Sequence, residues 1–121
     1  MSKRENISSG STWEPILGYS RAVKAGSYVH VSGTTGAGAN AAEQAKAALE
    51  TIKGALEKAG ATMAQVVRTR IFVTDISQWE SIGKVHGEYF GEIRPAMAMV
   101  EVSKLIDPAL FVEIEADAYI G

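Results

Sequence analysis

Residues 94–117 read RPAMAMVEVSKLIDPALFVEIEAD, and this stretch predicts two β-strands joined by a turn. Side-chain character alternates from Met97 to Val102 and again from Phe111 to Tyr119, as it does in strands. Because alternate side chains of a strand lie on opposite faces, one face of the second strand is apolar and the other carries carboxylates. These carboxylates belong to Glu113, Glu115 and Asp117. Like charges on one face repel, so we expect this face to be solvated, functional or part of an interface.

The composition describes an ordinary globular chain of 121 residues with 46% hydrophobic residues and a formal net charge of −2. This length predicts a single domain over residues 1–121, and the charge argues against a nucleic-acid partner. The chain has no cysteine, and its two histidines, His30 and His86, do not stand at a metal-ligand spacing. No apolar run is long enough for a signal peptide or a membrane span. We therefore expect a soluble cytoplasmic protein with no metal, no cofactor and no membrane partner.

The N-terminal part of the chain predicts an arm followed by a β-hairpin. Residues 2–15 are polar, and we expect an extended arm in which Trp13 is the packing anchor. Two strand-like runs, 19–24 and 28–33, then flank a turn in which Gly26 supplies the necessary backbone freedom.

A glycine-rich loop and a helix follow the hairpin. The loop, residues 33–38, is expected to be a flexible connection that borders a site. Apolar residues recur at helical spacing over residues 40–59, with Asn40 as the N-cap and Gly60 after the end of the helix.

Residues 66–74 predict a further strand, and a second helix is expected to start at Ser77. The predicted inner face of the strand is formed by Val67, Thr69, Ile71 and Val73. In the helix, Ser77 and Glu80 match a capping box, and Gly91 ends it. Two glycines inside this helix each cost about 1 kcal/mol relative to alanine, which suggests a close approach near His86.

The predicted element order is ββαβαββ, and right-handed crossovers place both helices on the same face of one mixed sheet. The uncovered face is expected to carry His30, Ser32, Arg68, Arg70, Met97, Met99, Glu113 and Glu115. An exposed face that combines apolar side chains with opposite charges favours a homo-oligomer with sites at its seams.

Four segments together resemble the RidA/YjgF family of reactive intermediate deaminases. They are GYSRAVKAGSYVHVSG at 18–33, the helix at 40–60, VVRTRIFVTDI at 66–76 and the stretch at 94–118. The resemblance implies an α+β, chorismate-mutase-like fold and a homotrimer with three clefts between subunits. It also implies hydrolysis of an enamine or imine of a small metabolite to a carbonyl product and ammonia, without a cofactor.

Carried over by position, the family's water-positioning glutamate is Glu113, its first-strand aromatic residue is Tyr19, and its strand-end pair is Ser32 and Gly33. The position of the arginine that clamps a substrate carboxylate is occupied by Met97. Methionine has no hydrogen-bond donor, so the cleft is expected to be more apolar.

Three further residues complete the predicted site. His86 is a candidate second acid or base, although a helix-surface or interface histidine is the alternative. Arg94 is a candidate replacement for the missing guanidinium, and Met99 a candidate lining residue. Two other functions stay open: a trimer that binds a metabolite without turnover, and an endoribonuclease.

Overall fold

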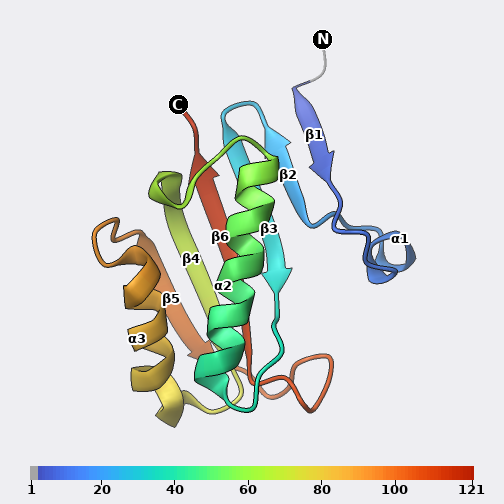
Figure 1. Cartoon of the computed structure of the whole chain (residues 1–121). Coiled ribbons are helices and arrows are strands. Elements are labelled where there is room, and N and C mark those ends of the chain that lie inside the picture. The colour runs from blue at the N-terminus through green and yellow to red at the C-terminus, as the bar shows by residue number, and fades with distance from the viewer. Residues whose placement is uncertain (1–2) are drawn as a thin grey trace.

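The structure is a computed structural model that describes residues 3–121. Its elements, in chain order, are β1 (Arg4–Ile7), α1 (Trp13–Leu17), β2 (Ala22–Ala25), β3 (Tyr28–Thr34), α2 (Ala41–Lys58), η1 (Met63–Gln65), β4 (Val66–Val73), η2 (Ile76–Gln78), α3 (Trp79–Phe90), β5 (Ala96–Glu101) and β6 (Val112–Tyr119). Figure 1 shows α2 and α3 side by side in front of a single sheet.

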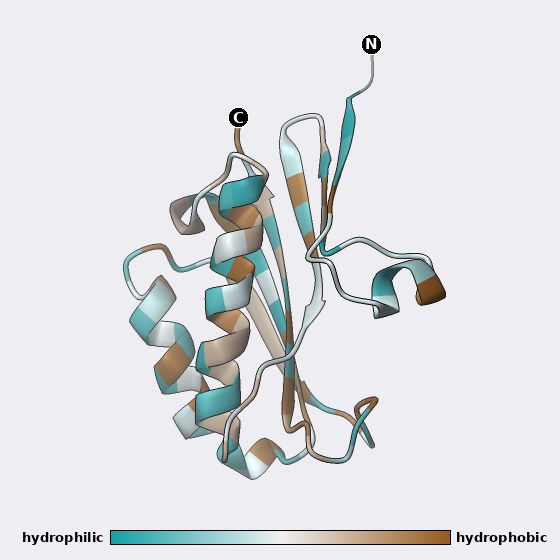
Figure 2. Cartoon of the chain, turned by 45° about the vertical axis from the view of Figure 1, so that its right-hand side comes forward, coloured by the Kyte–Doolittle hydropathy of each residue, from teal (hydrophilic) through white to brown (hydrophobic). Residues whose placement is uncertain are grey.

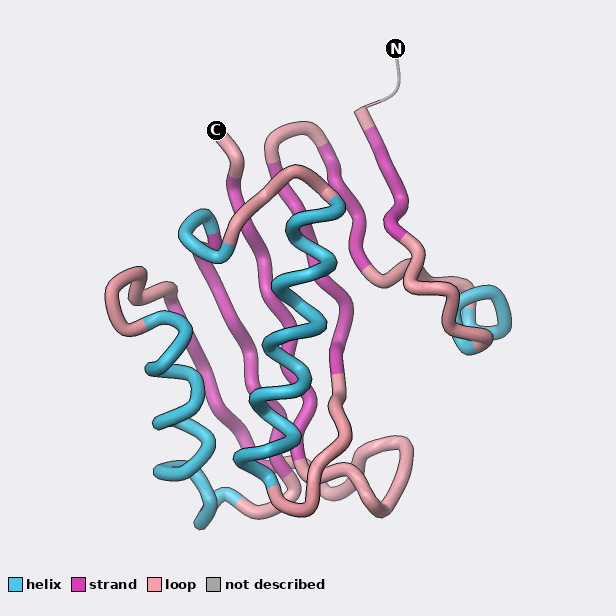
Figure 3. The backbone as a smooth tube through the Cα atoms, in the orientation of Figure 1, coloured by secondary structure: helices cyan, strands magenta, loops and turns pink. Residues whose placement is uncertain are grey.

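The sheet has six strands in the order β1-β2-β3-β6-β4-β5. Strands β4 and β5 pair in parallel, whereas the other neighbours are antiparallel. Both long helices cover one face, as predicted, and the short helix α1 lies on the other side of the sheet (Figures 1 and 2). The predicted ββαβαββ order is confirmed for the core and is preceded by β1 and α1 (Figure 3).

The core lies between the two helices and the sheet. Its largest fully buried apolar side chains are Phe90, Leu49, Ile52, Leu56, Ile71, Ile82 and Ile114. On β6 the apolar side chains are buried and the acidic ones face away, so the alternation read from the sequence is confirmed. No helix in the described residues is both long and apolar enough to span a membrane.

Helix α2 begins and ends as its sequence predicts. The side chain of Asn40 accepts a hydrogen bond from the backbone N–H of Glu43 at 2.9 Å. After the helix, Gly60 has a φ of +84°, and the N–H of Ala61 donates to the carbonyl oxygen of Leu56 at 2.8 Å. Glycine adopts this left-handed conformation without steric cost, which explains the sharp end of the helix.

The loop between β3 and α2 packs tightly against that helix. A Cβ atom on Gly36 would overlap Ala47 and the backbone of α2, and one on Gly38 would overlap Glu43 and the backbone nitrogen of Gln44. These two glycines therefore allow a close approach of loop to helix, and the flexible connection that we expected is wrong at this point.

Several local predictions from the sequence are wrong. The N-terminal arm is extended, as predicted, over β1, but its end forms helix α1, in which Trp13 is 55% exposed rather than packed as an anchor. Val67 is exposed because the pairing of β4 with β6 shifts between Val66 and Arg68. The capping box predicted at Ser77 and Glu80 is absent: α3 starts at Trp79 without a side-chain cap. Asp75 instead caps η2, and its carboxylate accepts hydrogen bonds from both the N–H and the hydroxyl of Ser77.

The two glycines inside α3, Gly83 and Gly87, face open space, since a Cβ atom on either would meet nothing within 4 Å. The close approach predicted near His86 is therefore wrong.

Candidate functional site

A β-bulge in strand β3 brings Glu113 against Gly33. Val31 pairs with Ala116 on β6, but Thr34 pairs with Ile114, so β3 has one residue more than its partner over this interval. Such a bulge bends the strand and changes the direction of its side chains. The carboxylate of Glu113 lies over the Cα of Gly33, where a Cβ atom would overlap its Oε2 oxygen. Two of the predicted site residues, Gly33 and Glu113, are thus in contact.

Two side-chain hydrogen bonds connect the bulge to the segment that precedes β2. The hydroxyl of Ser32 donates to the carbonyl oxygen of Ser20 at 2.6 Å. The Nη2 of Arg21 donates to the carbonyl oxygen of Gly33, also at 2.6 Å. The Ser32 hydroxyl therefore holds the bulge by donating within the chain, and its part in a site stays a prediction.

Tyr19 and Ser32 line one hollow beside this bulge. The hollow has a volume of about 480 Å³ and is formed by residues of β1, α1, β2 and β3 and the segments between them. The guanidinium of Arg21 lies 5.9 Å from the centre of the Tyr19 ring. Glu14 of α1 also lines the hollow, and its carboxylate accepts hydrogen bonds from Ser8 and Ser9.

Glu113 keeps its proton to a higher pH than an ordinary glutamate. Partial burial raises the pKa of its carboxyl group, the nearby Glu115 raises it further, and Arg21 lowers it. A carboxylate with a raised pKa is a stronger base when it is ionised, which suits it to take a proton from water.

Met97 and Met99 lie on the helix side of the sheet, so their predicted place on the uncovered face is wrong. In the parallel pairing of β5 with β4, Met97 stands beside Thr69 and Met99 beside Ile71, and both β4 residues are buried under the helices. Neighbours in register share a face, which fixes the side on which the methionines lie. Because β5 is an edge strand, Met97 remains 46% exposed there.

The two methionines line a second hollow, of about 670 Å³, with residues of α3 that include Trp79, Gly83 and Lys84. This methionine hollow is separate from the one that contains Tyr19 and Ser32. Within one chain, the predicted site residues therefore form two groups that do not share a pocket.

His86 is a core residue, and its predicted role beside Glu113 is wrong. Its Nε2 lies 2.9 Å from the hydroxyl oxygen of Thr69, and its ring packs against Phe90 with centroids 4.7 Å apart. Thr69 faces the helices, whereas Glu113 is on the opposite face of the sheet. Burial lowers the pKa of His86, which keeps the imidazole neutral. The surface or interface alternative is equally wrong, since the residue is 8% exposed.

Arg94 occupies the turn between α3 and β5. Its φ is +57°, its N–H donates to the carbonyl oxygen of Phe90 at 2.7 Å, and the residue is exposed. Whether it supplies the missing guanidinium stays a prediction.

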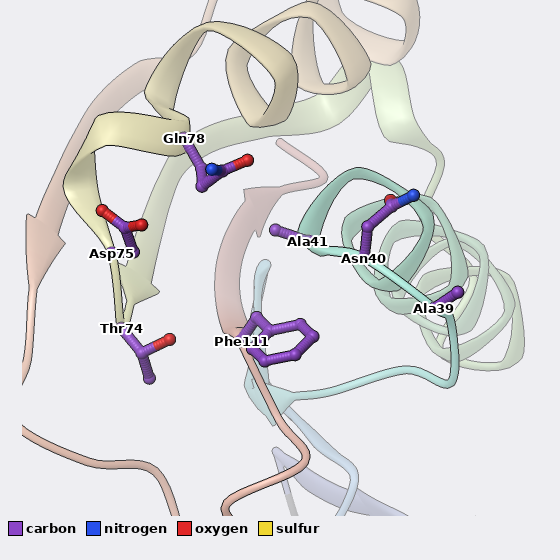
Figure 4. A pocket seen from close by; sticks show the side chains of 7 residues that line it. All are labelled: Ala39, Asn40, Ala41, Thr74, Asp75, Gln78 and Phe111. Atoms are coloured by element: carbon purple, nitrogen blue, oxygen red, sulfur yellow. The ribbon is translucent and has the colours of Figure 1, made fainter.

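Sequence reasoning overlooked a third hollow, shown in Figure 4, near the start of α2. It measures about 330 Å³ and is lined by Ala39, Asn40, Ala41, Thr74, Asp75, Gln78 and Phe111. Its one carboxylate, that of Asp75, is held by Ser77, and these hydrogen bonds lower its pKa. None of the predicted site residues lines it.

The mixed six-stranded sheet with two helices on one face defines an α+β protein of the chorismate-mutase-like type. The family model described as Endoribonuclease L-PSP matches residues 10–120. The chain therefore belongs to this family, which is the RidA/YjgF family indicated by its sequence.

Similar proteins agree with this assignment. The crystal structure of Rv2704, a YjgF/YER057c/UK114 family member from Mycobacterium tuberculosis, has a TM-score of 0.95 and 59% identity, over 96% of this chain and 98% of that one. A RutC family protein of Pyrococcus abyssi is 39% identical over 88% of this chain and 89% of its own length. The 3-aminoacrylate deaminase RutC of Acinetobacter baylyi is 35% identical over 97% of this chain and 98% of its own length.

Proposed function

We propose that the protein hydrolyses a small imine or enamine to a carbonyl compound and ammonia. The observation that carries this proposal is the half-buried carboxylate of Glu113, held over Gly33 with a raised pKa. The similarity to a 3-aminoacrylate deaminase supports the same class of reaction.

In the proposed reaction, Glu113 accepts a proton from water while the water oxygen attacks the imine carbon. The C=N π electrons become a lone pair on nitrogen, which takes up a proton and gives a carbinolamine. Glu113 then passes its proton to the amine as the C–N bond breaks, and the hydroxyl loses a proton as the carbonyl forms. Overall, one imine and one water give one carbonyl compound and one ammonia.

We further propose that the active unit is a homotrimer in which the bulge of one copy meets the methionine hollow of the next. The uncovered sheet face supports this arrangement, because Tyr28 and Tyr119 are exposed there, and their rings lie 5.0 Å apart. On the same face Arg70 lies 3.5 Å from Glu115 and 3.4 Å from Asp117. An exposed face that mixes aromatic rings with ion pairs is suited to association between identical chains.

The charges around the bulge favour a substrate without a carboxylate group. Glu113 and Glu115 lie close together on β6, and the charge of Arg21 acts on Glu113 and also on Glu14. Met97 supplies an apolar surface on the facing side of the proposed cleft. A neutral or protonated imine with an apolar substituent fits these surroundings better than an anionic imino acid.

The test is a competition for imines released by an oxidase, with semicarbazide as the trapping reagent. An amino-acid oxidase supplies imines that carry a carboxylate, and a flavin amine oxidase supplies imines without one. We expect the wild type to slow semicarbazone formation with the amine oxidase, and Glu113→Ala not to do so. Equal semicarbazone rates with and without the wild type, in both arms, would refute the proposed reaction.

The apolar methionine hollow favours a second candidate, a trimer that binds a small apolar metabolite without turnover. A ligand that raises Tm according to its concentration, while no product forms, would support this alternative.

A further inference from the structure

Arg21 and Glu113 contact the same residue from two directions. The Nη2 of Arg21 donates to the carbonyl oxygen of Gly33 at 2.6 Å, and the Glu113 carboxylate lies against the Cα of that glycine. The N–H of Ser32 donates back to the carbonyl oxygen of Arg21 at 3.0 Å. The bulge is therefore held between the segment before β2 and the start of β6.

We propose that Arg21 is a positioning residue for Glu113, an inference that rests on the proposed function. Its guanidinium fixes the carbonyl of Gly33, so that the bulge presents a bare Cα under the carboxylate, and it places a positive charge beside the group that takes the proton from water.

The guanidinium of Arg21 uses only some of its hydrogen-bond donors within the chain. Among the described residues, the Nε of Arg21 is buried and has no hydrogen-bond partner. A buried donor without an acceptor is costly, so a guanidinium that served only to brace the loop would be expected to have its donors satisfied. The charge of Arg21 also acts on two carboxylates, those of Glu14 in α1 and Glu113 in β6, and lowers the pKa of each.

The charges that face Glu113 determine what the loss of Arg21 does. Glu115 raises the pKa of Glu113 and Arg21 lowers it, while Arg70 is paired with Glu115 and Asp117. Without Arg21, burial and Glu115 remain, and both favour the protonated form. The carboxyl group then holds its proton to a higher pH, so less of it can act as a base near neutrality.

The experiment follows the side-chain carboxyl carbon of Glu113 by ¹³C NMR during a pH titration, with Glu113→Gln used to assign the signal. The variants are Arg21→Gln, which removes the charge, and Arg21→Lys, which keeps it. Lys53→Gln is the matched control, because it removes one positive charge from the exposed surface of α2. Thermal melting confirms that each variant is folded.

We expect Arg21→Gln to raise the titration midpoint of Glu113, Arg21→Lys to restore most of the difference, and Lys53→Gln to leave the midpoint unchanged. An unchanged midpoint in folded Arg21→Gln would overturn the proposal, and so would equal shifts in Arg21→Gln and Lys53→Gln.

The same variants in the imine assay separate this inference from the proposed function. If the wild type hydrolyses imines, the acid limb of the kcat/KM profile should move to higher pH in Arg21→Gln by the same amount as the NMR midpoint. A profile that falls uniformly without moving would contradict the role of the charge. If the wild type hydrolyses none of the imines, the reaction is refuted, while the NMR titration still decides whether Arg21 sets the ionisation of Glu113.

Discussion

Substitution of Gly33 by alanine should separate the activity of this protein from its stability. A Cβ atom at this position would lie 3.0 Å from the Cδ of Glu113 and 3.4 Å from its Cγ, and would overlap Oε2. The backbone of Gly33 does not have a positive φ, so alanine is compatible with it. The carboxylate must therefore move aside while the bulge itself remains.

The two effects have different expected sizes. A catalytic group displaced by about 1 Å can lose on the order of 10²-fold in rate. In contrast, replacing a strand glycine by alanine stabilises by about 0.5–1 kcal/mol, which offsets part of the cost of moving one side chain. We expect Gly33→Ala to lose most of its imine hydrolysis and to change the free energy of unfolding by less than about 1 kcal/mol.

The measurements are urea unfolding and the semicarbazide assay, with Gly54→Ala as the control. A Cβ atom on Gly54, within α2, would meet nothing within 4 Å, so this variant should be about 1 kcal/mol more stable and equally active. The reasoning fails if Gly33→Ala keeps wild-type activity, because the carboxylate would then not need its place over the glycine.

Three further results are expected. Thr69→Val should cost about 1–3 kcal/mol of unfolding free energy in urea, because it leaves the buried His86 without its partner, and a smaller loss would mean that water replaces the hydroxyl. The folded-state pKa of His86 is lowered, so its contribution to stability should be complete above pH 6.5 and decline below it; His86→Phe should flatten this dependence of Tm on pH. Asn40→Ala should cost about 1 kcal/mol in urea by removing the N-cap of α2, and an unchanged midpoint would contradict that role.

The sheet and the two helices on its face could be predicted because the patterns that indicate strands and helices depend only on residues close together in the sequence. Alternation in β6 and helical spacing in α2 depend on neighbouring residues, and the structure confirms both. The position of β5 was harder to infer. Its methionines lie under α3 because β5 pairs in parallel with β4 at the sheet edge, and that register depends on the connection after α3, not on the residues of β5 alone.

The two largest errors at the site have a similar origin. His86 lies one position after Val85 and four before Phe90, both buried, so its spacing already places it on the inner face of α3. Its polarity favoured an exposed role, but Thr69, on the predicted inner face of β4, provides the partner that makes burial possible. Arg21 was overlooked because its contact with Gly33 depends on a bulge, and a bulge has no clear sequence pattern.

The tight packing of Gly36 and Gly38 against α2 connects this helix to the loop that begins at Gly33, beneath the Glu113 carboxylate. Gly33 stands only three residues before Gly36, so the glycine that supports the Glu113 carboxylate is tethered to a helix on the opposite layer. Alanines fill much of the inner surface of that helix, and such short side chains cannot change rotamer to absorb a displacement. A larger side chain at one of these positions, for example at Ala48, is expected to displace the loop of residues 33–38. The position of the Glu113 carboxylate thus limits which substitutions the inner surface of α2 can accept.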